Sequence, residues 1–137
     1  MSYFLDTNTC IYALNGKFPA VGQRMARTSP DQIKVPSMVK AELLLGAEKS
    51  DRKQRTLEVL AAFMSPLEVV PFCTLAAEQY ARIRANLEST GQSIGPNDLI
   101  IAATVLAQGG TLVTHNIREF SRVEGLRVED WVGKASE

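Results

Sequence analysis

The chain has 137 residues and a mass of 15.0 kDa, the size of one compact domain. With 45% hydrophobic residues and a mean hydropathy of −0.04, the composition excludes a disordered chain. Fifteen Lys and Arg balance fifteen Asp and Glu, which excludes polybasic and polyacidic tails. Because no apolar run reaches the roughly 18 residues of a membrane span and no signal-peptide pattern opens the chain, we expect one cytoplasmic domain over residues 1–137.

Apolar runs alternate with helical patterns along the chain, which predicts an α/β fold with a mostly parallel central sheet of four to five strands. Strands are expected at Tyr3–Leu5, Ile33–Val35, Leu67–Val70 and Thr111–Thr114, with Leu126–Val128 as a further candidate. Helices are expected over Cys10–Leu14, Pro19–Arg27, Ser37–Lys49, Asp51–Met64, Thr74–Leu87 and Asn97–Leu106.

Polar residues mark where two of these helices begin. Thr7 or Asn8 is the expected cap of the first helix, and Ser37 is the expected cap of the third. The helix over 97–106 is apolar nearly all round, so it is expected at the centre of the fold. In the helix before it, Leu75 is assigned to the apolar stripe.

Cysteine and histidine are too sparse for most metal chemistry. Cys10 and Cys73 lie far apart and outside any C-x-x-C spacing, as expected of buried free thiols in a reducing compartment. His115 is the one histidine of the chain, which excludes a paired-histidine nuclease and disfavours a structural zinc site. A metal site in this chain would therefore use oxygen ligands.

Three acidic residues lie in apolar surroundings. Asp6 ends an apolar strand, Glu42 lies within the apolar stripe of a helix, and Asp98 begins the most hydrophobic helix. An unpaired carboxylate is unfavourable in such places, which favours one shared site over three coincidences. Two alternatives stay open: Asp6 and Asp98 can serve as helix caps or dipole partners, and Glu42 can pair with a buried arginine.

The expected fold brings these acids to one edge of the sheet, because the carboxyl ends of parallel strands and the following helices meet there. Carboxylates gathered at one edge repel each other unless a cation lies between them, and oxygen ligands select Mg²⁺ or Mn²⁺. If Asp6, Glu42, Asp98 and Glu119 share this pocket, eleven acids remain against fifteen bases elsewhere. An acidic pocket in a mildly basic surface suits a polyanionic substrate such as RNA.

Four motifs carry a resemblance to a known family. In chain order they are Phe4–Asn8, Ala41–Leu43 with Gly46–Ser50, Ile94–Asp98, and Val113–Asn116 with Arg118–Phe120. In their joint order and spacing they resemble the PIN-domain ribonucleases, and more narrowly the VapC toxins of VapBC toxin–antitoxin modules. The resemblance runs from Tyr3 to Trp131 and so covers nearly the whole chain.

The resemblance implies a PIN-like fold, with helices on both faces of the sheet, whose acids hold Mg²⁺ or Mn²⁺ and cut RNA internally. Asp6, Glu42 and Asp98 match three family acids as catalytic and metal-binding residues, and the fourth acidic position falls at or near Asn116. Glu119 is expected to supply the missing charge if the segment after Asn116 folds back. Expected roles are phosphate orientation by the metal on Asp6 and Asp98, and placement or deprotonation of the attacking water by Glu42, leaving a 5′-phosphate and a 3′-hydroxyl.

Neighbouring residues are expected to support these acids. Thr7, Asn8 and Thr114 are predicted to orient the carboxylates, with helix capping and strand-end bonding as the alternative. His115 is expected at the surface, with RNA stacking as the weaker alternative. Trp131 is expected to anchor the C-terminal segment by packing.

The resemblance also implies partners: a cognate VapB-like antitoxin that covers the site, a second copy of the chain in a homodimer, and an RNA substrate. The Gly-Pro-x-Asp and Thr-x-Asn motifs resemble those of toxins that cut initiator tRNA in its anticodon stem-loop. DNA contact is expected only through the antitoxin, and no membrane contact is expected.

Two other functional classes are kept open. A phosphatase or phosphotransferase would use Asp6 as a covalent nucleophile, although Asn8 stands where such enzymes usually carry a second aspartate. A non-catalytic PIN-like binding module would use the same acids only to contact a partner, and the amide of Asn116 is compatible with it.

Overall fold

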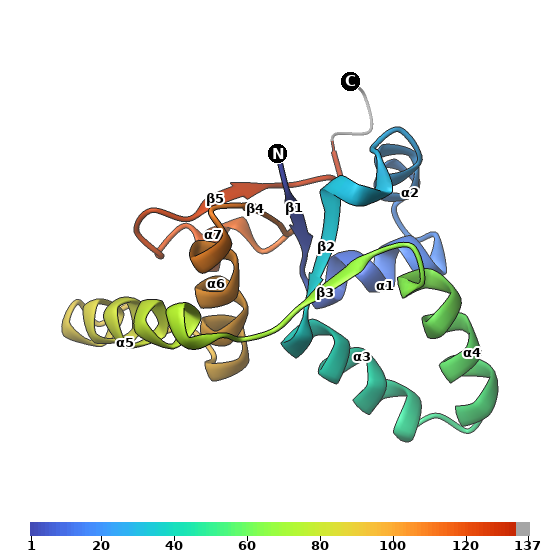
Figure 1. Cartoon of the computed structure of the whole chain (residues 1–137), viewed down its shortest axis with the longest axis horizontal. Coiled ribbons are helices and arrows are strands. Elements are labelled where there is room, and N and C mark those ends of the chain that lie inside the picture. The colour runs from blue at the N-terminus through green and yellow to red at the C-terminus, as the bar shows by residue number, and fades with distance from the viewer. Residues whose placement is uncertain (134–137) are drawn as a thin grey trace.

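The computed structural model describes residues 1–133 and contains a five-stranded parallel sheet with helices on both sides (Figure 1). The strands are β1 (Tyr3–Leu5), β2 (Ile33–Pro36), β3 (Glu68–Val70), β4 (Thr111–Val113) and β5 (Arg127–Glu129). The helices are α1 (Thr7–Asn15), α2 (Pro19–Ala26), α3 (Ser37–Glu48), α4 (Lys53–Met64), α5 (Thr74–Ser89), α6 (Pro96–Gln108), α7 (Ile117–Phe120) and a 3-10 turn at Pro30–Gln32. The predicted α/β class and parallel sheet are confirmed.

The order of the strands creates a crevice between β1 and β4. Across the sheet the order is β3-β2-β1-β4-β5, and every neighbouring pair is parallel. The chain moves from β1 outward through β2 to β3, then returns to the other side of β1 as β4. Because parallel crossovers are right-handed, α1 and α6 belong to opposite faces. Ligands of such sheets bind where the winding direction reverses, which here is beside the carboxyl ends of β1 and β4.

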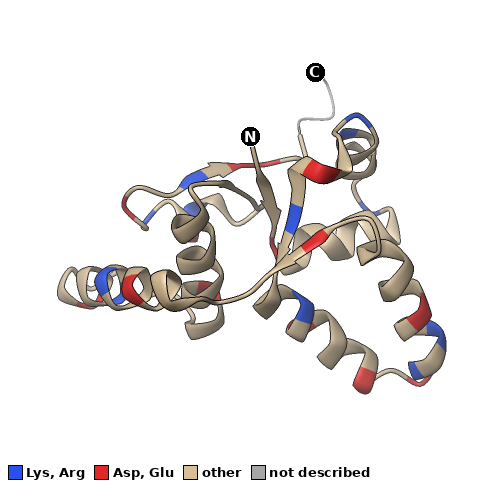
Figure 2. Cartoon of the chain, in the orientation of Figure 1, with Lys and Arg blue, Asp and Glu red and all other residues tan. Residues whose placement is uncertain are grey.

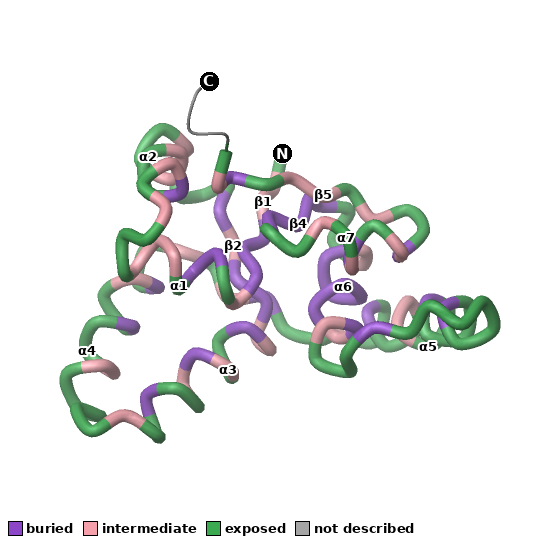
Figure 3. Tube along the Cα trace, turned by 180° about the vertical axis from the view of Figure 1, so that it is seen from behind, coloured by how far each residue is buried: buried purple, intermediate pink, exposed green. Residues whose placement is uncertain are grey.

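The core lies on the central strands and on α6, as Figure 3 shows by burial. Phe4, Leu5 and Leu112 are fully buried. Helix α6 buries Ile101 and Val105 together with most of its length, as its apolar surface predicts. No helix in residues 1–133 is long and apolar enough to cross a membrane.

Several local predictions were wrong. Neither Thr7 nor Asn8 caps α1: the cap is Asp6, the alternative given above for this residue, and its side chain accepts from the backbone N–H of Thr9. Ser37 does not cap α3 but is its first residue, because Pro36 supplies the extended conformation before it. The apolar stripe of α5 does not include Leu75, whose exposed fraction is 49%.

Two further differences concern thiols and short elements. Cys10 and Cys73 are both free, but Cys73 is only partly buried. The helix predicted from Asp51 begins at Lys53, because residues 51 and 52 form the turn after α3. The four-residue helix α7 was not assigned from the sequence, since it is too short for a helical pattern to show.

Candidate active site

A small polar pocket lies at the crevice between β1 and β4. It has a volume of about 150 Å³, and residues from four separate parts of the chain line it: Asp6, Thr7, Asn8, Glu42, Asp98, Asn116 and Phe120. All three acids that the sequence singled out are in this lining, as are Asn116 and two of the three predicted supporting residues. The structure therefore brings together residues that are up to 114 positions apart.

Asp6 is fixed by its neighbours at the carboxyl end of β1. Its exposed fraction is 6%, its backbone N–H donates to the carbonyl of Val113, and its Oδ1 accepts from the N–H of Thr9 at 2.8 Å. Burial raises the pKa of Asp6, the hydroxyl of Thr114 and the N–H of Thr9 lower it, and the charge of Glu42 raises it again. Asp6 therefore caps a helix and also presents a carboxylate to the pocket.

Glu42 is half-buried on α3 and is held by two side chains rather than by an arginine. The hydroxyl of Thr7 donates to its Oε1 at 2.5 Å, and the amide of Asn97 donates to its Oε2 at 3.2 Å. Thr7 begins α1 and Asn97 lies in the first turn of α6, so Glu42 connects three helices. These contacts orient the carboxylate but leave it without a compensating positive charge.

Asp98 and Glu119 lie close enough to share one proton. Desolvation, a hydrogen bond to Glu119 and the charges of Glu119, Glu42 and Asp6 raise the pKa of Asp98 to about 7. Burial raises the pKa of Glu119, but hydrogen bonds from Asn116 and Asp98 outweigh it, and the net shift is downward. These opposite shifts favour Asp98 over Glu119 as the carboxyl that carries a proton.

Helix α7 places Glu119 in this pair. The amide of Asn116 donates to its Oε2 at 2.9 Å, and the backbone N–H of Gly95 donates to its Oε1 at 3.3 Å. The segment after Asn116 does fold back, as the sequence analysis required for Glu119 to join the other acids. Thr114 supports the same loop, because its hydroxyl accepts from the N–H of Asn116 at 3.0 Å.

The pocket carries negative charge that no described cation neutralises. None of the ion pairs within residues 1–133 includes Asp6, Glu42, Asp98 or Glu119. Arg122 is near enough to lower the pKa of Glu119, but its guanidinium donates to the carbonyl of Ser93. Elsewhere the two signs of charge are interspersed along the outer helices (Figure 2).

The donor set fits a hard divalent cation in chemistry, although the side chains are not yet in ligand positions. Three carboxylates and two amides in the lining offer oxygen atoms, Glu119 adds a fourth carboxylate beside Asp98, and the lining contains no thiol or imidazole. Among residues 1–133, no three Asp, Glu, His or Cys side chains are already arranged around one metal position. Because ligands must lose their protons, a cation would have to displace the proton that Asp98 and Glu119 share.

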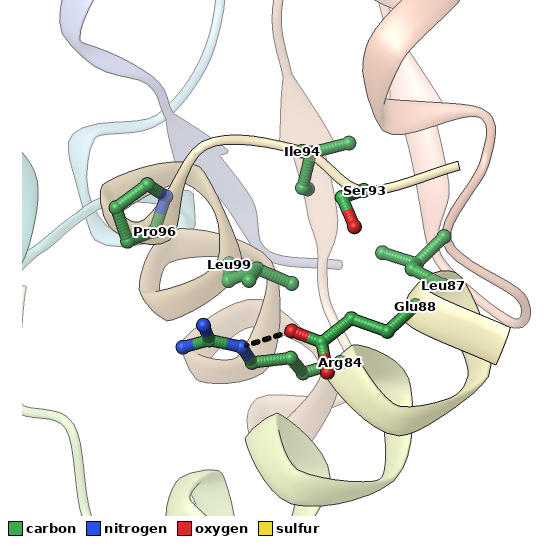
Figure 4. A pocket seen from close by; sticks show the side chains of 7 residues that line it. All are labelled: Arg84, Leu87, Glu88, Ser93, Ile94, Pro96 and Leu99. Atoms are coloured by element: carbon green, nitrogen blue, oxygen red, sulfur yellow. Dashed lines mark hydrogen bonds and ion pairs between the residues drawn. The ribbon is translucent and has the colours of Figure 1, made fainter. Parts of the chain in front are cut away.

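A second hollow lies beyond the acidic pocket, between α5 and the start of α6 (Figure 4). Its charged lining residues, Arg84 and Glu88, pair with each other at 2.9 Å. Apolar side chains such as Leu87 and Leu99 form much of the remaining wall. This hollow lacks the cluster of carboxylates that marks the first pocket.

Sequence reasoning missed two contributors to the site. Asn97 orients Glu42, and the N–H of Gly95 orients Glu119. Both belong to the Gly-Pro-Asn-Asp segment at which α6 begins. The available signal was the position of these polar groups beside Asp98 at a helix start, where backbone N–H groups are left unpaired.

Known proteins resemble this chain over nearly its whole length. A model of the PIN domain matches residues 3–126. The chain belongs to the PIN-domain family. Among curated PIN-domain relatives, the tRNA(fMet)-specific endonuclease VapC of Salmonella typhimurium is 39% identical over 131 residues, covering 96% of this chain and 98% of that protein. Ribonuclease VapC2 of Rickettsia felis is 39% identical over 132 residues, with the same coverage.

Solved structures of the family give the same fold. The crystal structure of VapBC2 from Rickettsia felis bound to a promoter DNA fragment matches with a TM-score of 0.90 and 38% identity, over 96% of this chain and 99% of that one. The DNA-bound VapBC structure from Salmonella typhimurium matches with a TM-score of 0.90 and 39% identity, over 96% and 98% of the two chains. The PIN-like fold predicted from the motifs is confirmed.

Proposed function

We propose that this chain is the toxin of a type II toxin–antitoxin module and cuts RNA internally with the help of Mg²⁺ or Mn²⁺. The single observation that carries the proposal is the pocket in which Asp6, Glu42 and Asp98 meet, with Glu119 in contact with Asp98 and no ion pair to any of the four acids within residues 1–133. The ribonuclease names of PIN-domain relatives at 39% identity support RNA as the substrate. The name of the Salmonella typhimurium relative further supports initiator tRNA.

Asp6, Glu42 and Asp98 are the proposed metal ligands. A divalent cation bound there would neutralise phosphate charge and lower the pKa of a water molecule. Asp6 supplies an oxygen held by Thr9 and Thr114, so its position is set before substrate arrives. Asp98 becomes a ligand when the proton shared with Glu119 leaves, which couples metal binding to pH.

Glu42 is the proposed general base. Thr7 and Asn97 hold its two oxygens, so the carboxylate needs no large reorientation to accept a proton. Transfer of that proton from water to Glu42 accompanies attack of the water oxygen on the phosphorus and cleavage of the bond from phosphorus to the 3′-oxygen. The 3′-oxygen takes a proton from solvent as it leaves, which yields a 5′-phosphate and a 3′-hydroxyl. Asn116 and Glu119 complete the pocket by holding Asp98 in place.

The proposed partner is a VapB-like antitoxin. An apolar pocket of about 270 Å³ lies beside the acidic one, shares Glu42 with it, and is lined by side chains including Ile11, Leu14 and Leu60. An apolar segment of an antitoxin seated there would cover the site. The VapBC titles of similar solved structures support this partner. Homodimer formation stays a prediction, which light scattering after size exclusion checks.

The test is incubation of the purified chain with total tRNA and Mg²⁺, followed by mapping of the RNA ends. We expect internal cuts that EDTA prevents and that Asp98→Asn abolishes. Glu58→Gln removes an exposed acid on α4 and serves as the matched control, with full activity expected. Undiminished cutting by Asp98→Asn, or cutting that EDTA leaves unchanged, would refute the site assignment.

The same experiment separates the alternatives. A phosphatase with Asp6 as nucleophile would form a trapped phosphoenzyme and release phosphate, which membership of the PIN-domain family disfavours. A binding module without catalysis would leave all RNA intact while still binding it. The proposed nuclease forms no phosphoenzyme and does not leave the RNA intact.

A further inference from the structure

A cluster of ring side chains lies next to the acidic pocket and has no part in the proposed chemistry. The rings of Tyr12 and Phe18 pack edge to face with centroids 4.7 Å apart, and His115 lies 6.4 Å from Tyr12 and 5.8 Å from Phe18. The ammonium of Lys17 lies 5.8 Å from the ring centre of Tyr12 and 5.4 Å from that of Phe18. Within residues 1–133, Lys17 forms no ion pair.

Helix α1 and the segment after β4 each contribute residues both to this cluster and to the pocket. On α1, Asn8 lines the pocket and Tyr12 follows one helical turn later on the same side. After β4, Asn116 lines the pocket and His115 is the residue directly before it. The cluster therefore adjoins the pocket through α1 and through the segment after β4.

The ring of His115 is held in place but remains accessible. Its Nδ1 lies 2.8 Å from Oδ2 of Asp130, and because a carboxylate only accepts, Nδ1 is the donor. Asp130 is itself fixed, since its Oδ1 accepts from the N–H of Val132. The side chain of His115 nevertheless keeps an exposed fraction of 49%. A ring fixed at one edge and open to solvent offers a stacking surface without a large loss of side-chain entropy.

We propose that His115 forms a base-stacking subsite for a nucleotide that flanks the cut, with Tyr12 and Phe18 behind it and Lys17 supplying positive charge. The subsite rests on the proposed ribonuclease function, because its ligand is the RNA that the acidic pocket cuts. Stacking of this kind tolerates any base, so the subsite adds affinity and position rather than sequence choice.

The test compares His115→Ala and His115→Phe with the wild-type chain on the anticodon stem-loop RNA of initiator tRNA. We expect His115→Ala to lower kcat/KM by about 5- to 150-fold, mainly through KM, as stacking on one ring predicts. His115→Phe keeps a ring but loses the bond to Asp130, and it should restore most of the loss. Phe72→Ala is the matched control: Phe72 is a partly exposed aromatic paired with Tyr80, and its removal should change nothing.

A second arm tests abasic substrates with both the wild-type chain and His115→Ala. Stem-loops with a single abasic nucleotide at each position beside the cut should show one position where kcat/KM falls as much as in His115→Ala. At that position the two losses should not multiply, because both remove the same contact.

Each other outcome has a definite meaning. Three results would overturn the stacking proposal and leave the proposed ribonuclease function standing. They are losses that multiply at every abasic position, a His115→Ala variant that cuts like the wild type, and a loss that His115→Phe does not restore. A His115→Ala variant that weakens only antitoxin binding would also overturn it, in favour of a protein partner on this surface. A wild-type chain that cuts no RNA would instead remove the proposed function, and the subsite with it.

Discussion

Asp98→Asn should stabilise the metal-free protein while abolishing its activity. The pKa of Asp98 rises from an ordinary 3.8 to about 7, because the carboxyl is partly desolvated and lies among Glu119, Glu42 and Asp6. Between these two pH values the folded chain holds a proton that the unfolded chain releases, so stability falls as pH rises and the full penalty is present above pH 7. An asparagine of the same shape carries no such penalty.

The size of the gain can be bounded from the same groups. A pKa raised from 3.8 to about 7 corresponds to at most about 4 kcal/mol. Because Asp98 is half-buried, solvent screens much of this free energy. The negative charge of Asp98 at the start of α6 also stabilises the helix by about 0.3–1 kcal/mol, which the variant loses. We therefore expect a net gain of about 1–2 kcal/mol at pH 8, or a Tm higher by about 3–6 °C.

Thermal unfolding in EDTA at pH 8 and pH 5 measures this gain. At pH 5 the folded wild type keeps its proton on Asp98, so the gain should fall to about a third. Glu58→Gln is the control, since Glu58 is exposed and forms no ion pair within residues 1–133. A Tm at pH 8 that is equal to or below that of the wild type would refute the reasoning about unneutralised charge.

Three further predictions concern other residues. Glu42→Gln should lower kcat by about 10²- to 10⁴-fold with little change in KM, as loss of a general base predicts. Steady-state kinetics on the stem-loop RNA measures both constants, and a raised KM with an unchanged kcat would mean that Glu42 only binds substrate. Thr114→Val removes the buried hydroxyl that lowers the pKa of Asp6. The pH–rate profile should therefore move to higher pH, and the half-saturating Mg²⁺ concentration should rise about 10- to 100-fold. An unmoved profile would contradict this. Gly110→Ala would place a Cβ 2.5 Å from Cε1 of Phe4 and 3.1 Å from the carbonyl oxygen of Ser2. In urea titrations this variant should lower the free energy of unfolding by about 1–3 kcal/mol. Gly46→Ala, whose added Cβ would have nothing within 4 Å, should raise the free energy of unfolding by about 0.5–1 kcal/mol.

Much of the fold could be predicted because local patterns and topology agree. Apolar runs such as Tyr3–Leu5 mark buried parallel strands, and the apolar surface of α6 indicates a central helix. The placement of Asp6 followed from its position after a strand, since parallel strands present their carboxyl ends at one edge. These features follow from the sequence pattern and the topology, without side-chain geometry.

The remaining features depend on contacts that local sequence does not encode. The hydroxyl of Thr7 donates to Glu42, 35 positions away, rather than capping α1. Glu119 joins Asp98 through the short helix α7, whose four residues carry no detectable period. Leu75 fits a helical stripe in sequence, yet it lies on the exposed side of α5. Long-range pairing decides each of these, and it becomes visible only in three dimensions.

The central claim is that Asp6, Glu42 and Asp98 share one divalent cation. Anomalous diffraction from crystals soaked in Mn²⁺ measures this most directly. The account predicts an anomalous peak within coordination distance of carboxylate oxygens of Asp6, Glu42 and Asp98, with Asp98 separated from Glu119. A pocket without a peak at saturating Mn²⁺, in which the carboxyl groups of Asp98 and Glu119 stay within hydrogen-bonding distance of each other, would contradict it.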